Sequence, residues 1–314
     1  MPQIRTERDG RVLTVTLDNP PRNFMTGAMV AELDNLITSL EGDRQIGAVI
    51  LTGAPEDIFI THYDVSEILA GTEGMGGTMS QTVVGGGLRA VGALARVPGM
   101  SGSLERTPAA GVMALRRFHE MFLTMNRMDK VFIAAINGHA LGGGCELSLA
   151  CDIRLMARGD FRIGQPEMLL GFPPGGGGTQ RLTRILGPGA ALESMLEGTV
   201  YSPEEAEAYG IVNRTLPREQ LLDEARALAA RLSRRAPASV AALKRAVYEG
   251  GSRSLAEGLH LERAGFLASA SHPAARRAMK AYVDYIDEYG DAPLADEDLT
   301  EPWRQGIAVD LTKD

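Results

Sequence analysis

Cysteine, aromatic residues and metal-ligand patterns are scarce in this sequence. Only two cysteines occur among 314 residues, Cys145 and Cys151, and their spacing is not that of a CxxC pair. We interpret both as buried structural thiols. The five histidines form no HExxH pair or other spacing suited to a metal, so no metal site is expected.

Long apolar runs and long runs of one charge are missing as well. No apolar stretch approaches the roughly 18 residues that span a bilayer, and residues 1–9 are charged rather than apolar. The 32 basic and 40 acidic residues give a net charge of −8, and their even spread leaves no electrostatic footprint for nucleic acid. We expect a soluble, cytoplasmic protein with neither a membrane nor a nucleic-acid partner.

What the sequence does contain is an alternation of strand and helix patterns. With 44% hydrophobic residues, the chain can build one large core or two small ones. Residues 11–17 (RVLTVTL) and 48–52 (AVILT) predict strands, and residues 27–40 between them carry apolar side chains at helical spacing. A helix over 111–128, a strand over 131–137 and a helix from Gly142 form a second unit. These units predict an α/β fold.

Two later regions depart from this alternation. Residues 70–108 concentrate glycine and contain Pro98 and Pro108, which predicts an inserted loop, a lid or a partly disordered segment. From the capping box at Ser202 (SPEE) onward, helices predominate, over 218–235, 239–248, 254–270 and 274–289. The acidic tail either wraps a neighbouring surface through Trp303 or stays mobile. We therefore divide the chain into residues 1–201, 202–290 and 291–314.

The segment most informative about chemistry is 131–152, in which an apolar strand leads through Gly142, Gly143 and Gly144 into an apolar helix. Three glycines let the backbone turn sharply and let a ligand approach the main chain. The first N–H groups of a helix attract negative charge. The turn fits an oxyanion site, and it equally fits a tight turn without a ligand. A dinucleotide-binding GxGxxG pattern fits poorly, and the sequence has no GK[ST] motif.

Residues 130–147 (KVFIAAINGHALGGGCEL), with IGQPE at 163–167 and TQRL at 179–182, resemble the signature of the crotonase family. The resemblance extends over about residues 12–272. It implies a crotonase-like spiral of ββα turns followed by a C-terminal α-helical region used in trimer formation. It also implies an enzyme of acyl-CoA thioesters that forms a homotrimer or a dimer of trimers. No cofactor is expected, since coenzyme A is part of the substrate.

The resemblance implies that the backbone N–H groups of Tyr63 and Gly143 hold the thioester oxygen. Two preorganised donors aimed at a developing enolate are each worth on the order of 3 kcal/mol. Tyr63 lies in FITHYDV (59–65), where family members usually have Ala-Gly in place of Thr61-His62. A histidine in place of that glycine requires compatible backbone angles. Without the resemblance, these residues also fit an ordinary strand exit.

Glu146 and Glu167 match the two carboxylates of the family. Hydration needs one group that accepts a proton from water and another that supplies a proton to the α-carbon. We expect Glu146 in the first turn of a helix, where the dipole favours its ionised form, and a raised pKa for a buried partner. The two would titrate as a coupled pair. Taken singly, each also fits a helix-terminal charge or a surface residue.

The resemblance further places Asp64, Gly142, Gly144, Pro174 and Gly175 around the substrate pocket. Successive N–H groups in the loop 171–178 (GFPPGGGG) suit a phosphate, whereas in the family this loop shapes the pocket. For the anionic end of coenzyme A, Arg22 and Arg263 are candidates, although both also fit solvated surface charges.

Together these features predict an enoyl-CoA hydratase, which adds water reversibly across the 2,3 double bond of a 2-enoyl-CoA thioester. The nearest alternative is an isomerase of the same fold, which needs only Glu167 and the enolate site. From another class, the alternative is a non-catalytic acyl-CoA-binding subunit that has kept the fold. Binding of acyl-CoA without turnover would favour that last interpretation.

Overall fold

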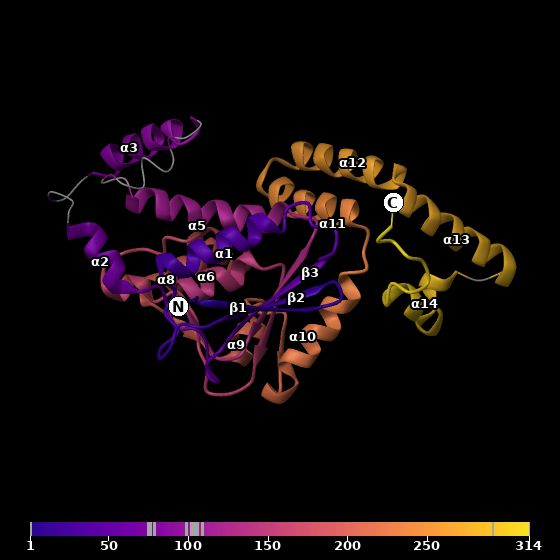
Figure 1. The fold of residues 1–314 in the computed structure, drawn as a ribbon, viewed down its shortest axis with the longest axis horizontal. Helices are drawn as coiled ribbons and strands as arrows, with labels where there is room; N and C mark the ends of the chain where they lie inside the picture. Colours follow the sequence, from indigo (N-terminus) through magenta and orange to yellow (C-terminus); the bar gives the residue numbers. More distant parts are fainter. Residues whose placement is uncertain are drawn as a thin grey trace.

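Two β-sheets surrounded by helices form the body of the protein, and a group of C-terminal helices extends to one side (Figure 1). The structure is a computed structural model that describes residues 2–73, 77, 80–97, 100, 107, 110–290 and 292–313.

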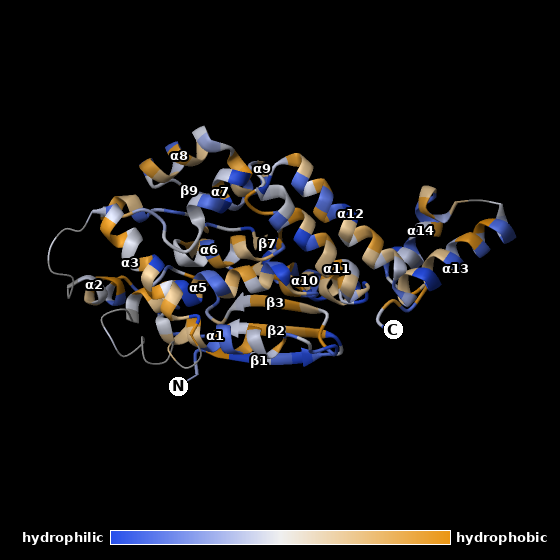
Figure 2. Cartoon of the chain, turned by 90° about the horizontal axis from the view of Figure 1, so that it is seen from above, coloured by the Kyte–Doolittle hydropathy of each residue, from blue (hydrophilic) through white to orange (hydrophobic). Residues whose placement is uncertain are grey.

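The larger sheet has six strands in the order β1-β2-β3-β5-β7-β10, and all neighbours are parallel except β1 and β2. β3 is buried along nearly its whole length, as expected where both faces of a parallel sheet are covered. Figure 2 shows β2 and β3 as largely hydrophobic and the edge strand β1 as hydrophilic. The strands are β1 Ile4–Asp9, β2 Val12–Leu17, β3 Ala48–Gly53, β5 Val131–Ile136, β7 Ile153–Ala157 and β10 Arg214–Leu216.

The smaller sheet has four strands in the order β4-β6-β8-β9, of which β4, β6 and β8 are parallel. Along the chain, β4 follows β3, β6 follows β5 and β8 follows β7, so each turn adds one strand to each sheet. The predicted spiral of ββα turns is confirmed. These strands are β4 Ile58–Ile60, β6 His139–Leu141, β8 Ile163–Gly164 and β9 Val200–Tyr201.

Helices connect the turns of the spiral and cover its core. Thr26 caps α1 by accepting a hydrogen bond from the Met29 N–H, and α1 buries Met29, Leu33 and Ile37. The capping box at Ser202 is present and starts α9, as predicted. Cys145 and Cys151 are free and buried. The helices of this part are α1 Gly27–Ser39, α5 Ala110–Arg127, α6 Gly143–Ala150, the 3-10 helix η1 Glu167–Leu170, α7 Gly178–Leu186, α8 Pro188–Glu197 and α9 Pro203–Ala208.

The C-terminal helices are α10 Arg218–Leu232, α11 Pro237–Lys244, α12 Leu255–Ser271 and α13 Pro273–Tyr289, close to the predicted ranges. A π-helix, η2 Arg245–Glu249, continues α11, and the short 3-10 helix η3 Gly250–Ser252 follows it. The buried Lys244 joins this region to the core, because its Nζ donates to the carbonyls of Met125 and Lys130 and to Asp152.

Of the predicted alternatives for residues 70–108, an inserted loop, a lid or a partly disordered segment, the irregular loop is wrong for much of the described part. Helix α2 covers Val65–Glu73, and helix α3 covers Gln81–Leu94. Ser80 caps α3, and no proline falls within it, so four glycines at a cost of up to about 1 kcal/mol each do not prevent the helix. The predicted breakers Pro98 and Pro108 lie outside the described residues.

The acidic tail packs on its own chain. It forms η4 Pro293–Ala295 and α14 Glu297–Arg304, and the Trp303 ring meets Tyr282 of α13 edge-on with 5.7 Å between ring centroids. Arg235 donates to the Trp303 carbonyl at 3.0 Å. Of the two alternatives for the tail, the structure shows the ordered one. Across the described residues, no helix is long and apolar enough to cross a membrane.

Candidate active site

The turn between β6 and α6 brings Glu146 into the interior. Gly142 sits at φ +48°, a conformation that L side chains rarely adopt, and its N–H donates to the Gly164 carbonyl at 2.9 Å. α6 starts at the next residue and is buried throughout. Gly144 lies against β4, since a Cβ there would approach the Ile60 carbonyl oxygen to 2.3 Å. Glu146 therefore stands in the first turn of α6, as predicted.

Glu146 is 4% exposed and is held by the glycine-rich loop 171–178. Its Oε1 accepts hydrogen bonds from the Gly176 N–H at 2.6 Å and the Gly178 N–H at 2.9 Å. A Cβ on Gly176 would come within 2.2 Å of Glu146 Oε2, so glycine is required for this close approach. The N–H groups of this loop, which would also suit a phosphate, thus bind the Glu146 side chain of the protein itself.

Glu167 is the second predicted carboxylate, and it begins η1 directly after β8. Its Oε1 lies next to Gly142, where a Cβ would be 3.0 Å away. Turned with its nitrogen toward Glu167, the buried Gln165 amide donates to both carboxylate oxygens, at 2.7 and 3.1 Å. Gly142 and Gln165 thus fix Glu167 beside the same turn that positions Glu146.

The two carboxyl groups differ in their electrostatic surroundings. Burial raises the pKa of Glu167 to about 7; its own backbone N–H opposes this rise, and the charge of Glu146 adds to it. Burial also raises the pKa of Glu146, against the N–H groups of Gly178 and Gly176 and the positive charges of His119 and Arg181. The N–H groups of Gly176 and Gly178 partly offset the effect of burial on Glu146, and a negative charge on Glu146 favours a protonated Glu167. The pair can therefore accept one proton and supply another.

The N–H groups of Tyr63, after β4, and of Gly143, at the start of α6, lie near each other. Tyr63 pairs with Met25 in an isolated parallel bridge, flanked by hydrogen bonds from Met25 N to His62 O and from Asp64 N to Met25 O. A Cβ on Gly143 would lie 3.4 Å from the Tyr63 nitrogen. Neither N–H has an acceptor within the part of the chain that the structure describes. The structure thus brings together two N–H groups that have no acceptor among the described residues.

The Thr61-His62 pair does not disturb this arrangement. Asn23 is the only non-glycine residue with positive φ among the described residues, so His62 adopts backbone angles open to any residue. Its ring stacks on Phe24 with 4.5 Å between centroids, and its Nδ1 is 2.7 Å from the Tyr63 carbonyl oxygen. The histidine thus steadies the segment where the family usually has glycine.

The remaining predicted residues lie at different distances from this centre. Pro174 and Gly175 belong to the loop that holds Glu146. Asp64 accepts hydrogen bonds from the Ser66 N–H and hydroxyl, which caps α2. Arg22 is exposed, with its guanidinium 5.9 Å from the Phe24 ring centroid.

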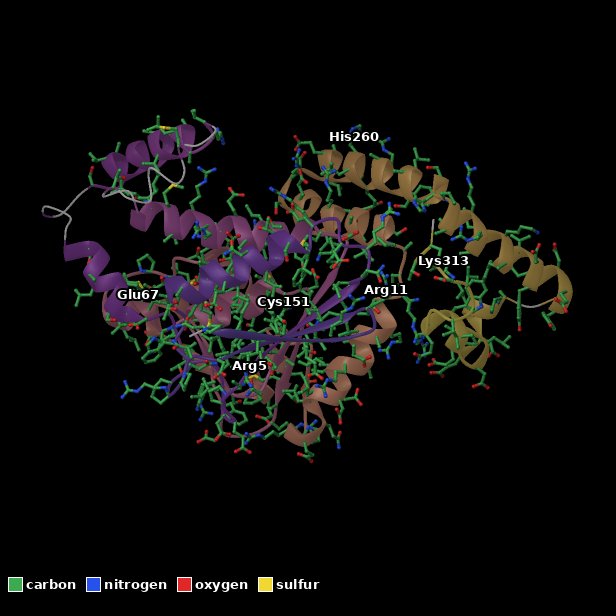
Figure 3. All side chains as sticks on the ribbon, in the orientation of Figure 1. Arg5, Arg11, Glu67, Cys151, His260 and Lys313 are labelled. Atoms are coloured by element: carbon green, nitrogen blue, oxygen red, sulfur yellow. The ribbon has the colours of Figure 1, made fainter. Side chains whose placement is uncertain are left out.

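Arg263 lies apart from the centre. It is exposed on α12, the helix that carries His260 in Figure 3. Glu67 of α2, which accepts a hydrogen bond from the Tyr63 hydroxyl at 2.9 Å, marks the Tyr63 end of the site. Figure 3 shows Glu67 far from His260 along the long axis of the molecule.

Several neighbours of the two glutamates were missed by the sequence analysis. Gln165 stands two residues before Glu167 in a motif already singled out, so its position was available as a signal. His119 of α5, with Nε2 2.7 Å from the Gly175 carbonyl oxygen, carried no local signal at all. No group of three or more His, Cys, Asp or Glu residues in the described ranges is arranged to hold a metal ion.

Comparison with known proteins gives a consistent result. Residues 7–89 and 102–291 match the family described as enoyl-CoA hydratase/isomerase. The chain is 32% identical over 279 residues to the short-chain-enoyl-CoA hydratase of Clostridium acetobutylicum, covering 88% of this chain and 93% of that protein. It is 34% identical over 282 residues to a probable enoyl-CoA hydratase of Mycobacterium tuberculosis, covering 90% and 95%. The solved enoyl-CoA hydratase of Bacillus anthracis superimposes with a TM-score of 0.72 at 28% identity, covering 90% of this chain and 96% of that one.

Proposed function

The chain belongs to the enoyl-CoA hydratase/isomerase family, and from this premise we propose that it adds water reversibly across the 2,3 double bond of a 2-enoyl-CoA thioester. One observation carries the proposal: two carboxyl groups in different electrostatic surroundings lie close to two unpaired N–H groups, those of Gly143 and Tyr63. Each of these parts corresponds to a requirement of hydration.

In this proposal, the thioester oxygen lies between the N–H groups of Tyr63 and Gly143. As water adds at the β-carbon, negative charge moves onto that oxygen as an enolate. Donors that are already in place stabilise this charge without reorganisation, at about 3 kcal/mol for each donor. The two N–H groups thus lower the barrier more than they strengthen binding of the uncharged substrate.

The carboxyl groups divide the proton transfers. Glu146, ionised and oriented by Gly176 and Gly178, accepts a proton from the attacking water. Glu167, whose pKa of about 7 keeps it protonated below that pH, supplies a proton to the α-carbon. The reverse reaction uses the same groups with their protonation states exchanged. In the isomerase alternative, Glu167 alone would move a proton along the chain and Glu146 would be dispensable.

The anionic end of coenzyme A and the oligomer belong to the same proposal. Arg22, close to the Tyr63 segment, binds the phosphates. α12 packs against α11, α13, η2 and η3, so Arg263 serves this role across a contact between copies. Exposed apolar side chains on α12 support such a contact in a homotrimer or a dimer of trimers: Leu255, Leu259, Phe266 and Leu267. Light scattering on the protein as it elutes from a size-exclusion column measures the number of copies in the oligomer.

The decisive experiment follows the loss of the conjugated enoyl-thioester absorbance of crotonyl-CoA. We expect hydration by the wild type, loss of activity in Glu146→Gln and in Glu167→Gln, and wild-type rates in Glu224→Gln, an exposed glutamate on α10. Retained binding of acyl-CoA by the two inactive variants shows that their pockets are intact. A 3-enoyl-CoA converted by Glu146→Gln would instead identify an isomerase. A wild type that binds acyl-CoA without turnover would identify a non-catalytic subunit.

A further inference from the structure

A second site is suggested by a groove of about 1000 Å³ between α5, the loop 174–177, the start of α7 and the π-helix η2. Among the described residues, Glu249 is the only carboxylate that lines it. The protein as a whole carries a net charge of −8, so this is a marked local excess of positive charge. Five arginines line the groove: Arg127, Arg181, Arg184, Arg245 and Arg253.

Much of this positive charge is not neutralised within the protein. Glu249 pairs with Arg245 at 3.3 Å and with Arg253 at 2.7 Å, so one carboxylate faces two guanidinium groups. Arg127 is exposed and has no ion-pair partner among the described residues. Guanidinium groups present fixed forks of N–H donors that match the oxygens of phosphate. The groove is suited to a ligand with more than one negative charge.

The lining also has an apolar part. Leu123 is 41% exposed and Val247 59% exposed, and Phe122 and Tyr248 lie beside them. The groove volume is within the usual range for small-molecule sites and exceeds that needed for a single phosphate. We propose that this groove binds a phosphorylated nucleotide, with its phosphates on the arginines and its base against the apolar side chains.

The groove communicates with the catalytic centre through one loop. Pro174, Gly175 and Gly176 line the groove, and the Gly176 N–H donates to Glu146. A ligand that shifts this loop changes the ionisation of Glu146. The nucleotide is either free or the nucleotide end of a CoA thioester; the second source rests on the proposed function and would assign the phosphates to this groove in place of Arg22.

Calorimetric titration with ADP at low salt tests the site directly. The variants are Arg127→Met, Arg253→Met and the double variant, and Arg226→Met serves as a control. Arg226 lines a cavity of about 760 Å³ in which arginines are mixed with Glu7 and Asp9. We expect binding by the wild type, at least about tenfold weaker binding by the double variant, unchanged binding by the control, and weakening with added salt.

Two results would overturn the proposal: no ADP binding at millimolar concentration, or the same affinity in the wild type and in Arg127→Met/Arg253→Met. Arg127→Met removes an exposed side chain that has no ion-pair partner in the described part of the chain, so this single variant remains informative if the double variant folds poorly. Neither result depends on catalysis, so failure of the hydratase proposal leaves this one intact.

The source of the nucleotide is decided by comparing crotonyl-CoA with crotonyl-pantetheine, which lacks the nucleotide. If the groove holds the substrate's own nucleotide, the double variant raises KM for crotonyl-CoA about tenfold, leaves KM for crotonyl-pantetheine unchanged, and crotonyl-CoA displaces ADP. If the ligand is a free nucleotide, ADP changes the hydration rate and both KM values are unchanged by the substitutions. Both results support a nucleotide site.

Discussion

Replacing Gly176 with alanine tests whether the loop 171–178 is part of the catalytic machinery. The added Cβ would come within 2.2 Å of both Glu146 Oε2 and Phe118 Cε1, so the loop has to move away from the carboxylate. That movement breaks the 2.6 Å hydrogen bond from the Gly176 N–H to Glu146. A hydrogen bond to a charged group contributes about 1.5–3 kcal/mol, which corresponds to a loss of about ten- to hundredfold in kcat, at about 1.4 kcal/mol per factor of ten.

The assay is steady-state hydration of crotonyl-CoA by Gly176→Ala and by Gly189→Ala, whose added methyl group on α8 meets nothing within 4 Å. KM should change little, because the N–H groups of Tyr63 and Gly143 are untouched. Loss of a donor raises the pKa of Glu146, so activity should begin to fall at a higher pH as the solution is acidified. Wild-type kcat in Gly176→Ala, or an equal loss in Gly189→Ala, would refute the reasoning.

Three further predictions concern charges. The pKa of Glu167 is about 7 against an ordinary 4.5, so its neutral form stabilises the fold below pH 4.5 and this contribution is lost as the pH rises through 7. The value of kcat/KM should decline as the pH rises through 7. Glu167→Gln should abolish this part of the pH dependence of stability. Gln165→Leu removes donors that favour the ionised Glu167, so the alkaline limb of the pH–rate profile should move to higher pH; an unmoved limb contradicts this role. Lys244→Met leaves Asp152 without its cation and should cost about 3–5 kcal/mol in urea unfolding, against no more than about 0.5 kcal/mol for the exposed Lys280→Met.

Local patterns were sufficient for much of the fold. β2, β3 and β5 are short β-branched or apolar runs, and α9 and α12 begin with capping boxes at Ser202 and Ser254, so each is recognisable from neighbouring residues alone. The pattern failed for α3, whose glycines suggested a loop. It also failed for β1, where Arg5, Glu7 and Asp9 occupy an exposed edge strand. In both cases few side chains of the segment are buried, so its apolar and polar residues do not alternate with the period of a strand or helix.

For the candidate site, the sequence by itself was enough to select the residues that we propose for the chemistry: two glutamates in two motifs and a turn of three glycines. Only the tertiary structure decided how those groups differ. The N–H groups that hold Glu146 come from residues 176 and 178, and the N–H beside Gly143 comes from residue 63. The raised pKa of Glu167 arises from burial among segments distant in sequence. Hydrogen-bond partners, desolvation and proton affinity depend on distances through space, which spacing along the chain does not fix.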